Sequence, residues 1–332
     1  MASSKEGTGT SGALAEAASP MEPTTPSPSP CSVPAPPGQA HPKLGIEPSG
    51  ALQPWTVRRI WYAAAALLGA SSIAWVVLAR TASRTTWPMD GATLTPPTVA
   101  APPDFERRHV FLDPGHGAPD NTGNRSSRCE DEQDFTLSLA VDLAPRLEAT
   151  GHFTVTLSRR PDQLVPYRER VATAAAANAD VFVSLHSDVR GTAEAERDCP
   201  TSRDAPGFSV LWSDDGEADL VAARHRLARE TAEALHALGL TAYDGNEYTG
   251  LYEGDAVEGV FVDRHLPSKR IFVLRQPTMP SIIIETHNAW DDREASRWEE
   301  EGTRAGFADA VAAALIAFFQ DDPPSSRKIS GG

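Results

Sequence analysis

The stretch DVFVSLH, residues 180–186, is a run of β-branched and aromatic residues that ends in a histidine. Two further apolar runs also end in a polar side chain: HVFLDPGH ends at His116, and SIIIE ends at Glu285. Short apolar runs bounded by turn residues predict strands that are buried on both faces. Because ligands collect at the carboxyl ends of strands in an open α/β sheet, we expect His116, His186 and Glu285 to lie close together.

Strand and helix patterns alternate along residues 108–320, which we expect to form one domain. Such alternation implies parallel crossovers, and therefore an α/β fold whose mostly parallel central sheet is covered by helices on both faces. The expected strands are 110–113, 153–158, 180–186, 207–212, 271–275 and 281–285, and the expected helices are 132–148, 167–179, 216–238 and 306–319.

Two stretches interrupt this alternation and are expected to be loop-like insertions near the strand ends. They are residues 190–206 and residues 241–268. Long loops without regular structure in a compact domain are usually functional or mobile. We therefore hypothesise that residues 241–268 cover the cleft until a regulatory protein partner, whose identity the sequence does not give, moves them.

The ends of the chain differ in composition from the domain. Residues 1–54 are rich in Pro, Ser and Ala, which predicts a disordered tail, and residues 321–332 predict a second flexible tail. Residues 60–79 carry no charge and, at about 1.5 Å per residue, are long enough to cross a ~30 Å hydrocarbon core. Residues 55–80 thus predict a transmembrane helix or signal anchor, and residues 81–107 an extended Pro/Thr-rich linker.

This arrangement places the domain outside the cytoplasm. We expect it in the cell envelope, anchored in the inner membrane through residues 60–79 and facing the periplasm. The alternative is that the apolar segment is a signal peptide, cleaved after export so that the domain is secreted. The net charge of −15 and the lack of a basic stripe exclude nucleic acid as a partner.

The three cysteines match no cysteine-rich metal cluster. Cys129 precedes Glu132 by three residues, and Cys199 lies in the loop after His186. Both could lie over the same strand ends and form a disulfide in an oxidising compartment. Two unrelated thiols are the alternative.

A metal site is the chemistry that the strand ends suggest. His116 lies on a glycine-rich turn, and Glu132 begins the helical stretch EQDFTLSLAVDLAPRLEA. Taken singly, Glu132 is typical of a carboxylate at a helix start and His186 of a structural histidine. Together, two imidazoles and one carboxylate are a ligand set of catalytic zinc, with the fourth position left to water or substrate. Glu285 remains as a partly desolvated acid suited to proton transfer.

These residues lie in motifs that resemble those of the zinc-dependent N-acetylmuramoyl-L-alanine amidases, across residues 110–319. The matching motifs are, in order, FLDPGHG, EQDFTLSLA, LSRRPD, ADVFVSLHSD and MPSIIIETHNAWDDRE. The spacing of the second motif in that family selects Glu132 as the ligand instead of its neighbours Glu130 and Asp131.

The resemblance implies hydrolysis of the amide between N-acetylmuramic acid and the L-alanine of the peptidoglycan stem peptide. His116, Glu132 and His186 would then hold zinc, and Glu285 would act as the general base. Arg275 also matches a family position. It would contact the substrate or orient Glu285, with a structural ion pair as an equal alternative.

Some positions depart from the family pattern. His287, Asn288 and Asp291 stand where relatives carry glycine, phenylalanine and asparagine, while Ala175 and Asp188 each replace an asparagine. We expect His287 to be an exposed loop residue, with a polar group in the cleft as the alternative. None of these changes removes a predicted ligand, so they bear on substrate detail more than on catalysis.

Two other functions fit the same residues. One is a catalytically silent module that keeps the fold to bind peptidoglycan, although such a module would usually have lost a ligand or the base. The other is a zinc peptidase acting on stem peptides, because the same ligands and base would serve any amide.

Overall fold

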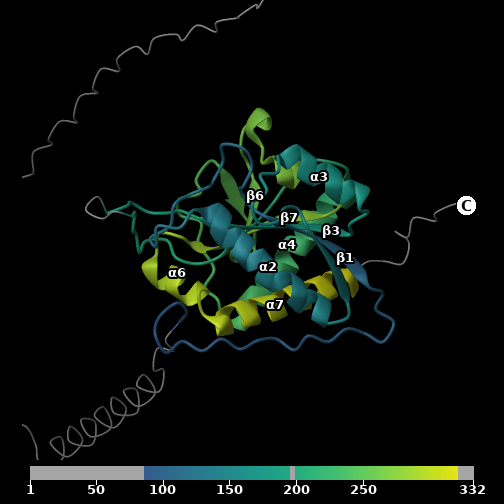
Figure 1. The fold of residues 1–332 in the computed structure, drawn as a ribbon, viewed down its shortest axis with the longest axis horizontal. Coiled ribbons are helices and arrows are strands. Elements are labelled where there is room, and N and C mark those ends of the chain that lie inside the picture. The colour runs from purple at the N-terminus through teal and green to yellow at the C-terminus, as the bar shows by residue number, and fades with distance from the viewer. Residues whose placement is uncertain (1–85, 195–198, 321–332) are drawn as a thin grey trace, which may run out of the picture. The chain divides into compact units, whose positions relative to one another are not determined.

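A seven-stranded sheet forms the centre of the computed structural model, which describes residues 86–194 and 199–320 (Figure 1). The predicted tails and the predicted membrane segment at 60–79 lie outside the described residues. The strand order is β2-β1-β3-β7-β4-β6-β5. The strands are β1 (Arg108–Pro114), β2 (Phe153–Leu157), β3 (Val181–Asp188), β4 (Ser209–Trp212), β5 (Tyr252–Gly254), β6 (Val260–Asp263) and β7 (Ser281–Asn288).

Four of the six strand pairings are parallel, which confirms the predicted mostly parallel sheet. Strands β2, β1, β3 and β7 run in one direction, and β4 lies antiparallel to β7. Strand β6 is parallel to β4, and β5 is antiparallel to β6. The carboxyl ends of β1, β3 and β7 therefore meet at one end of the sheet, and those of β4 and β6 at the other.

Helices cover both faces of this sheet, as predicted (Figure 1). Alternate residues of each strand point to opposite faces: in β1, Val110 and Leu112 pack with α2, α4 and α7, whereas Phe111 packs with α3 and α5. The helices are α2 (Glu132–Ala149), α3 (Tyr167–Ala176), α4 (Ala218–Leu238), α5 (Phe272–Arg275), α6 (Asp292–Trp298) and α7 (Glu301–Gln320), with a short 3-10 turn, η1 (Pro267–Lys269).

Helix α7 is long and apolar enough to cross a membrane. However, 67% of its most apolar window is buried inside the domain, where Phe307, Val311 and Leu315 belong to the larger core. The burial identifies α7 as a core helix. It is the single helix of this kind among residues 86–320 that the structure describes.

Two predictions about the second half of the domain are wrong. Residues 271–275 form the helical turn α5 in place of a strand, and Val273 and Leu274 are buried on the second face of the sheet. A short apolar run has no periodicity that separates a strand from a buried helical turn. Residues 241–268 are also not a simple loop, because they contain β5 and β6, which extend the sheet beyond β4.

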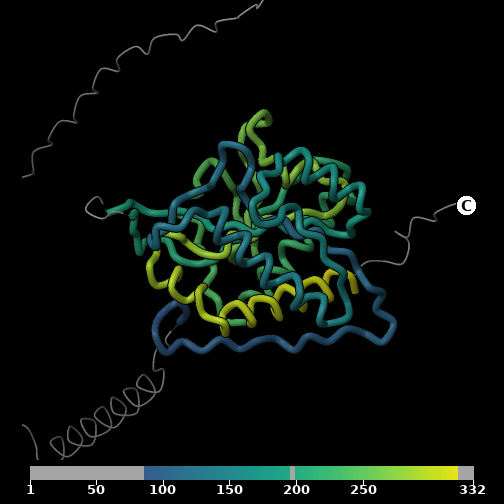
Figure 2. Tube along the Cα trace, viewed as in Figure 1, coloured from purple at the N-terminus to yellow at the C-terminus, as the bar shows by residue number. Residues whose placement is uncertain are grey.

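The segment before β1 belongs to the domain, contrary to the prediction that the domain starts after residue 107. Residues 92–102 form no helix or strand and a turn follows at residues 103–104, but Trp87 is 2% exposed and lies edge-on to Trp298. The backbone N–H of Thr95 donates to the carbonyl of Leu238 (2.8 Å), and Phe105 packs against the core. Figure 2 shows this segment passing beside α7. Apolar residues spaced among prolines show no periodicity, so the sequence did not reveal their burial.

Candidate metal centre

Three predicted ligands lie together at the carboxyl ends of β1 and β3. Nε2 of His116 is 3.0 Å from one carboxylate oxygen of Glu132, and Nδ1 of His186 is 3.0 Å from the other. One candidate ligand atom from each residue lies within 4.8 Å of the other two. Among the described residues this is the one group of three or more such side chains that could hold a metal ion.

The turn after β1 allows this close approach. His116 has a φ of +56°, and a Cβ atom added to Gly115 would lie 2.4 Å from Nε2 of His186. A larger residue at 115 would therefore clash with the imidazole. The glycine is required because the His186 imidazole and the carbonyl oxygen of Leu185, 2.6 Å from the added Cβ, leave no room for a side chain.

Two asparagines that the sequence analysis missed hold the ligands in place. Asn121 places Oδ1 at 2.7 Å from Nδ1 of His116. Asn124 donates to the Glu132 carboxylate from its backbone N–H (3.1 Å) and from Nδ2 (2.8 Å), and the N–H of Ser187 donates to the other oxygen (3.1 Å). Such partners fix the orientation of metal ligands. No local pattern distinguishes Asn121 and Asn124 from ordinary turn residues.

The cluster is electrostatically coupled. Burial would raise the pKa of Glu132, but hydrogen bonds to His116 and His186 and their positive charge lower it below its usual range. Burial lowers the pKa of each imidazole, but the hydrogen bond to Glu132 and the nearby negative charges together outweigh it, so that both pKa values are raised. The buried carboxylate therefore favours positive charge at this place.

Glu285 lies next to the cluster, where β7 pairs with β3 and its Cα is in register with that of His186. Its Oε2 atom is buried and accepts no hydrogen bond among the described residues. Burial raises the pKa of Glu285 to about 8, helped by the negative charges of Asp188 and Glu132 and opposed by His186. The structure thus places a carboxyl group with a near-neutral pKa beside the candidate ligands.

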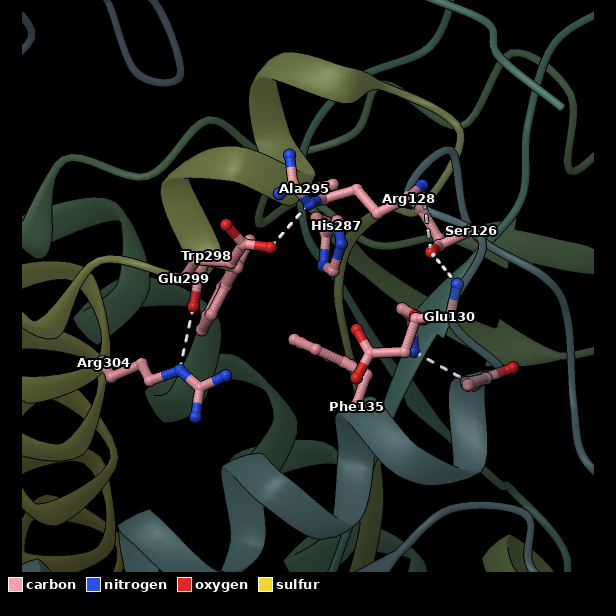
Figure 3. Close-up of a pocket in the computed structure, with 12 residues that line it drawn as sticks. Ser126, Arg128, Glu130, Phe135, His287, Ala295, Trp298, Glu299 and Arg304 are labelled. Carbon is pink, nitrogen blue, oxygen red and sulfur yellow. Dashed lines mark hydrogen bonds and ion pairs between the residues drawn. The ribbon is translucent and has the colours of Figure 1, made fainter. Parts of the chain in front are cut away.

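The neighbouring acids that competed with Glu132 in the sequence lie elsewhere. Asp131 forms an ion pair with Arg125 (2.9 Å). Glu130 lines a pocket on the other side of Glu132, where Figure 3 shows Phe135, His287 and Trp298 around the same space as the Glu130 side chain. Burial raises the pKa of Glu130. Of the three adjacent acids, the structure brings only Glu132 to the histidines.

A second group that the sequence analysis missed lies beside Glu285. The Tyr248 hydroxyl donates to the Asp188 carboxylate and lies 3.0 Å from Oγ of Ser209, whose Cα is paired with that of Glu285. Asp188 also lies 3.3 Å from Nε of Arg190. Because Tyr248 is buried, this part of residues 241–268 is packed into the domain and is not a free cover over the cleft.

Three of the departures from the family pattern, His287, Asn288 and Asp291, are buried, which contradicts the expected exposed position of His287. β7 continues three residues past Glu285, so His287 is 3% exposed and packs against Phe135 and Trp298. Burial lowers the pKa of His287 to about 3, which keeps the ring neutral. Asn288 donates to the carbonyls of Arg190 (3.1 Å) and Asp204 (2.8 Å), so it holds the loop after β3 against β7.

Cys129 and Cys199 are joined by a disulfide, with their Cα atoms 5.4 Å apart. The bond connects the loop that leads into Glu132 with the loop that follows β3. Cys129 has a φ of +64°, which is uncommon for a residue with a side chain. The crosslink therefore lies at the end of the sheet that carries the candidate ligands.

Arg275 is not brought to this cluster. Its carbonyl accepts a hydrogen bond from Arg224 (3.2 Å), which also donates to the carbonyl of Pro277 (2.8 Å), shortly before β7 begins. The four residue steps from Ser281 to Glu285 span about 13 Å, at about 3.3 Å per strand residue. The predicted role of Arg275 at the substrate or at Glu285 finds no support in the contacts of the described residues.

Comparison with known proteins identifies relatives of this domain. The sequence model of a family described as N-acetylmuramoyl-L-alanine amidase matches residues 110–317. N-acetylmuramoyl-L-alanine amidase AmiC of Escherichia coli O6:H1 is 26% identical over 242 residues, 66% of this chain and 54% of the relative. AmiC of Neisseria meningitidis serogroup B is 29% identical over 247 residues, 68% of this chain and 56% of the relative. The chain thus spans about half the length of these curated relatives.

Solved structures show the same fold. The amidase Ami1 from Mycobacterium smegmatis superposes with a TM-score of 0.52 at 22% identity, over 66% of this chain and 99% of that protein. An N-acetylmuramoyl-L-alanine amidase from Clostridium difficile 630 has a TM-score of 0.50 at 21% identity, over 66% of this chain and all of that protein (100%). At 21% and 22% identity, this similarity shows that the fold is shared.

Proposed function

The chain belongs to the N-acetylmuramoyl-L-alanine amidase family, and from this membership we propose that it hydrolyses the amide between N-acetylmuramic acid and L-alanine in peptidoglycan. The observation that carries the proposal is the cluster of His116, Glu132 and His186 beside Glu285, whose Oε2 atom has no partner among the described residues. The cofactor that we propose is zinc.

The donor set fits zinc on its chemistry. Two imidazole nitrogens and one carboxylate oxygen are a known set of three protein ligands for catalytic zinc. Oδ1 of Asn121 accepts a hydrogen bond from Nδ1 of His116, which leaves Nε2 of that ring as the metal-donor atom that faces Glu132. When bound, zinc supplies Lewis acidity that polarises the amide carbonyl and lowers the pKa of water.

Glu285 is the proposed general base. Its free Oε2 atom takes the proton of the attacking water and then delivers it to the nitrogen of the leaving amine. A pKa of about 8 in the metal-free protein suits a group that must both accept and release a proton near neutral pH. The metal ligands hold their geometry during this transfer because Asn121, Asn124 and Ser187 bind them.

We also propose that the enzyme acts in the cell envelope. The disulfide between Cys129 and Cys199 fits an oxidising compartment, where such bonds persist. The apolar residues 60–79 would anchor the chain in the inner membrane with the domain in the periplasm, or direct its secretion. Export brings the active site to peptidoglycan.

The test is hydrolysis of purified sacculi by the purified full chain, with and without a chelator, and after zinc is added back. We expect soluble stem peptides with new L-alanine amino termini, no products after chelation, and recovery with zinc. The Glu285→Gln variant should retain zinc without forming products. Activity that survives both chelation and this substitution would sink the mechanism.

The reaction products also distinguish the proposed amidase from the two alternative functions. Tight binding to sacculi without any hydrolysis, despite full zinc content, would indicate a silent binding module. Release of single amino acids from stem peptides, with the lactyl amide intact, would indicate a zinc peptidase.

A further inference from the structure

The turn that carries His116 directs three consecutive carbonyl groups into the protein, where two buried arginines bind them. Arg159 donates from Nε to the carbonyl of Pro114 (3.1 Å) and from Nη2 to that of Gly115 (3.0 Å). Arg170 donates from Nη1 to the carbonyl of Pro114 (2.9 Å) and from Nη2 to that of His116. Each guanidinium carries five N–H groups on three nitrogen atoms in a fixed fork geometry, and these contacts use that geometry.

Arg159 also connects the turn to the helix that begins at Glu132. Its Nη2 atom donates to the carbonyl of Gln133 (2.7 Å) and to the hydroxyl of Thr136 (3.2 Å), both in α2. That hydroxyl in turn donates to the carbonyl of Gly115 (2.8 Å). One side chain therefore binds the main chain next to His116 and the main chain next to Glu132.

The charge of Arg159 has no carboxylate at ion-pair distance among the described residues, although the side chain is 4% exposed. Burial lowers its pKa to about 10. By contrast, Arg170 is paired with Asp113 (2.9 Å), and both side chains are fully buried. A buried charge is costly unless it is well bound. The hydrogen bonds that compensate Arg159 go to the carbonyls of the turn and to Gln133 and Thr136 of α2.

The turn requires such support because its backbone is unfavourable. His116 has a φ of +56°, a region that residues with a side chain adopt at a cost. The main chain of Gly117 packs directly against Arg159, because a Cβ atom added to Gly117 would be 2.7 Å from the guanidinium carbon. The arginines fix the carbonyls on one side of the turn, which leaves the imidazole of His116 on the side of the cluster.

We propose that Arg159 and Arg170 are positioning residues for the metal ligands. Arg159 sets the distance between His116 and Glu132, and Arg170 sets the direction of His116. This inference rests on the proposed zinc site. It predicts that replacing either guanidinium by the single ammonium of lysine weakens zinc binding, although the charge is kept and neither residue touches the metal.

A matched control exists at the other end of the sheet. Arg224 is fully buried and donates to three main-chain carbonyls, those of Asp215, Arg275 and Pro277. Burial lowers its pKa to about 10, as for Arg159. Arg224→Lys should therefore cost stability for the same physical reason without disturbing the ligands.

The experiment measures zinc affinity by competition with a chelator, together with thermal unfolding of the metal-free full chain. We expect Arg159→Lys and Arg170→Lys to weaken zinc binding roughly 10-fold or more, and Arg224→Lys to change it less than about 2-fold at a comparable loss of Tm. Excess zinc should restore the hydrolysis that Arg159→Lys loses at limiting zinc. Thr136→Val provides a milder variant in case a lysine variant does not fold, and it should weaken zinc binding several-fold.

Two outcomes would overturn the inference. If the unsubstituted chain binds zinc tightly and Arg159→Lys, Arg170→Lys and Thr136→Val bind it as Arg224→Lys does, the positioning role is wrong and the zinc site stands. If the unsubstituted chain does not bind zinc, both the proposed function and the positioning role fail.

Discussion

Both ends of the sheet carry buried or half-buried charged side chains, but the acids at the two ends differ in their hydrogen-bond partners. At the carboxyl ends of β4 and β6, Asp214 is bound by Arg264 and by Arg270 (2.7 Å). Nearby, the fully buried Asp263 accepts hydrogen bonds from the N–H of Ile271 (2.7 Å) and from His265. The carboxylates of Asp214 and Asp263 thus both accept hydrogen bonds, which compensate their negative charge.

At the carboxyl ends of β1, β3 and β7, Glu132 and Glu285 form no ion pair with an arginine or a lysine among the described residues. Glu132 binds two imidazoles, and Glu285 has an oxygen atom with no partner among the described residues. The pKa values differ accordingly. Burial raises the pKa of Asp214, but hydrogen bonds from Arg270 and Arg264 lower it, whereas burial raises that of Glu285 to about 8.

This difference separates structural charges from functional ones. Native proteins satisfy nearly all buried polar groups, so an unsatisfied carboxyl group in a cleft marks a place for a ligand or a reacting proton. Charge alone does not make the distinction, because both ends contain arginines and acids. On the proposed function, the oxygen of Glu285 that has no hydrogen-bond partner among the described residues is the atom that accepts the proton.

The largest expected effect is on turnover, at the end of the sheet that carries the candidate metal centre. Glu285→Gln should lower the rate of sacculus hydrolysis by about 100- to 10,000-fold, because general acid–base catalysis contributes on that order. Zinc content, measured by metal analysis, should be unchanged. Asp214→Asn is the control at the other end and should hydrolyse sacculi at the rate of the unsubstituted chain. Comparable losses in both variants would remove the distinction between the two ends.

At the end of the sheet that carries the candidate metal centre, removing the disulfide should lower the free energy of unfolding the most. It connects cysteines 70 residues apart, and closing a loop of that length stabilises a protein by about 2–4 kcal/mol. The double variant Cys129→Ser with Cys199→Ser should lose about that free energy of unfolding in urea titrations. A reductant should lower the stability of the unsubstituted chain to the same level and leave the double variant unchanged. Free thiols at both cysteines in the exported protein would contradict the crosslink.

The raised pKa of Glu285 predicts a pH dependence of the metal-free protein. The folded state keeps the Glu285 proton up to about pH 8, whereas the unfolded state releases it near pH 4.5. The folded state thus binds more protons between these values, so the stability contribution is present below pH 4.5 and is lost as pH rises through 8. The loss should be about 2 kcal/mol, less than the full pKa shift would give, because the Glu285 side chain is half-buried and water screens part of the interaction. Urea titrations from pH 5 to 9 should show it, and Glu285→Gln should lessen it.

The smallest effect is expected at Asp214, at the carboxyl ends of β4 and β6. Its effect on stability should change with pH in the opposite direction to that of Glu285. Because the pKa of Asp214 is lowered, its contribution is present at neutral pH and is lost as pH falls through the folded-state value. Asp214→Asn should cost up to about 1 kcal/mol at pH 7, as for half-exposed ion pairs, and this cost should shrink toward pH 3. A cost that grows on acidification would show that Asp214 behaves like Glu285.

The same contrast explains how far the sequence could predict the site. His116, His186 and Glu285 each end an apolar strand run, and the rule that parallel strands expose their carboxyl ends together placed them correctly. Asn121, Asn124 and Tyr248 escaped notice, and Arg159 was given no role although it lies in the matching motif LSRRPD, because their contacts join residues that no local pattern relates. The strand at 207–212 was predicted without its antiparallel direction, and the helical turn α5 was predicted as a strand, since short apolar runs reveal neither direction nor type.

The sequence by itself determined the fold class, the positions of most strands and helices, and the side chains at the strand ends, because hydrophobic periodicity is a local property of the chain. Only the tertiary structure decided which charges are left without partners. It also decided that residues 86–107 belong to the domain, that His287 is buried, and that two arginines hold the turn of His116. Burial and hydrogen bonding between distant residues depend on how the elements pack, and packing is a property of the whole domain.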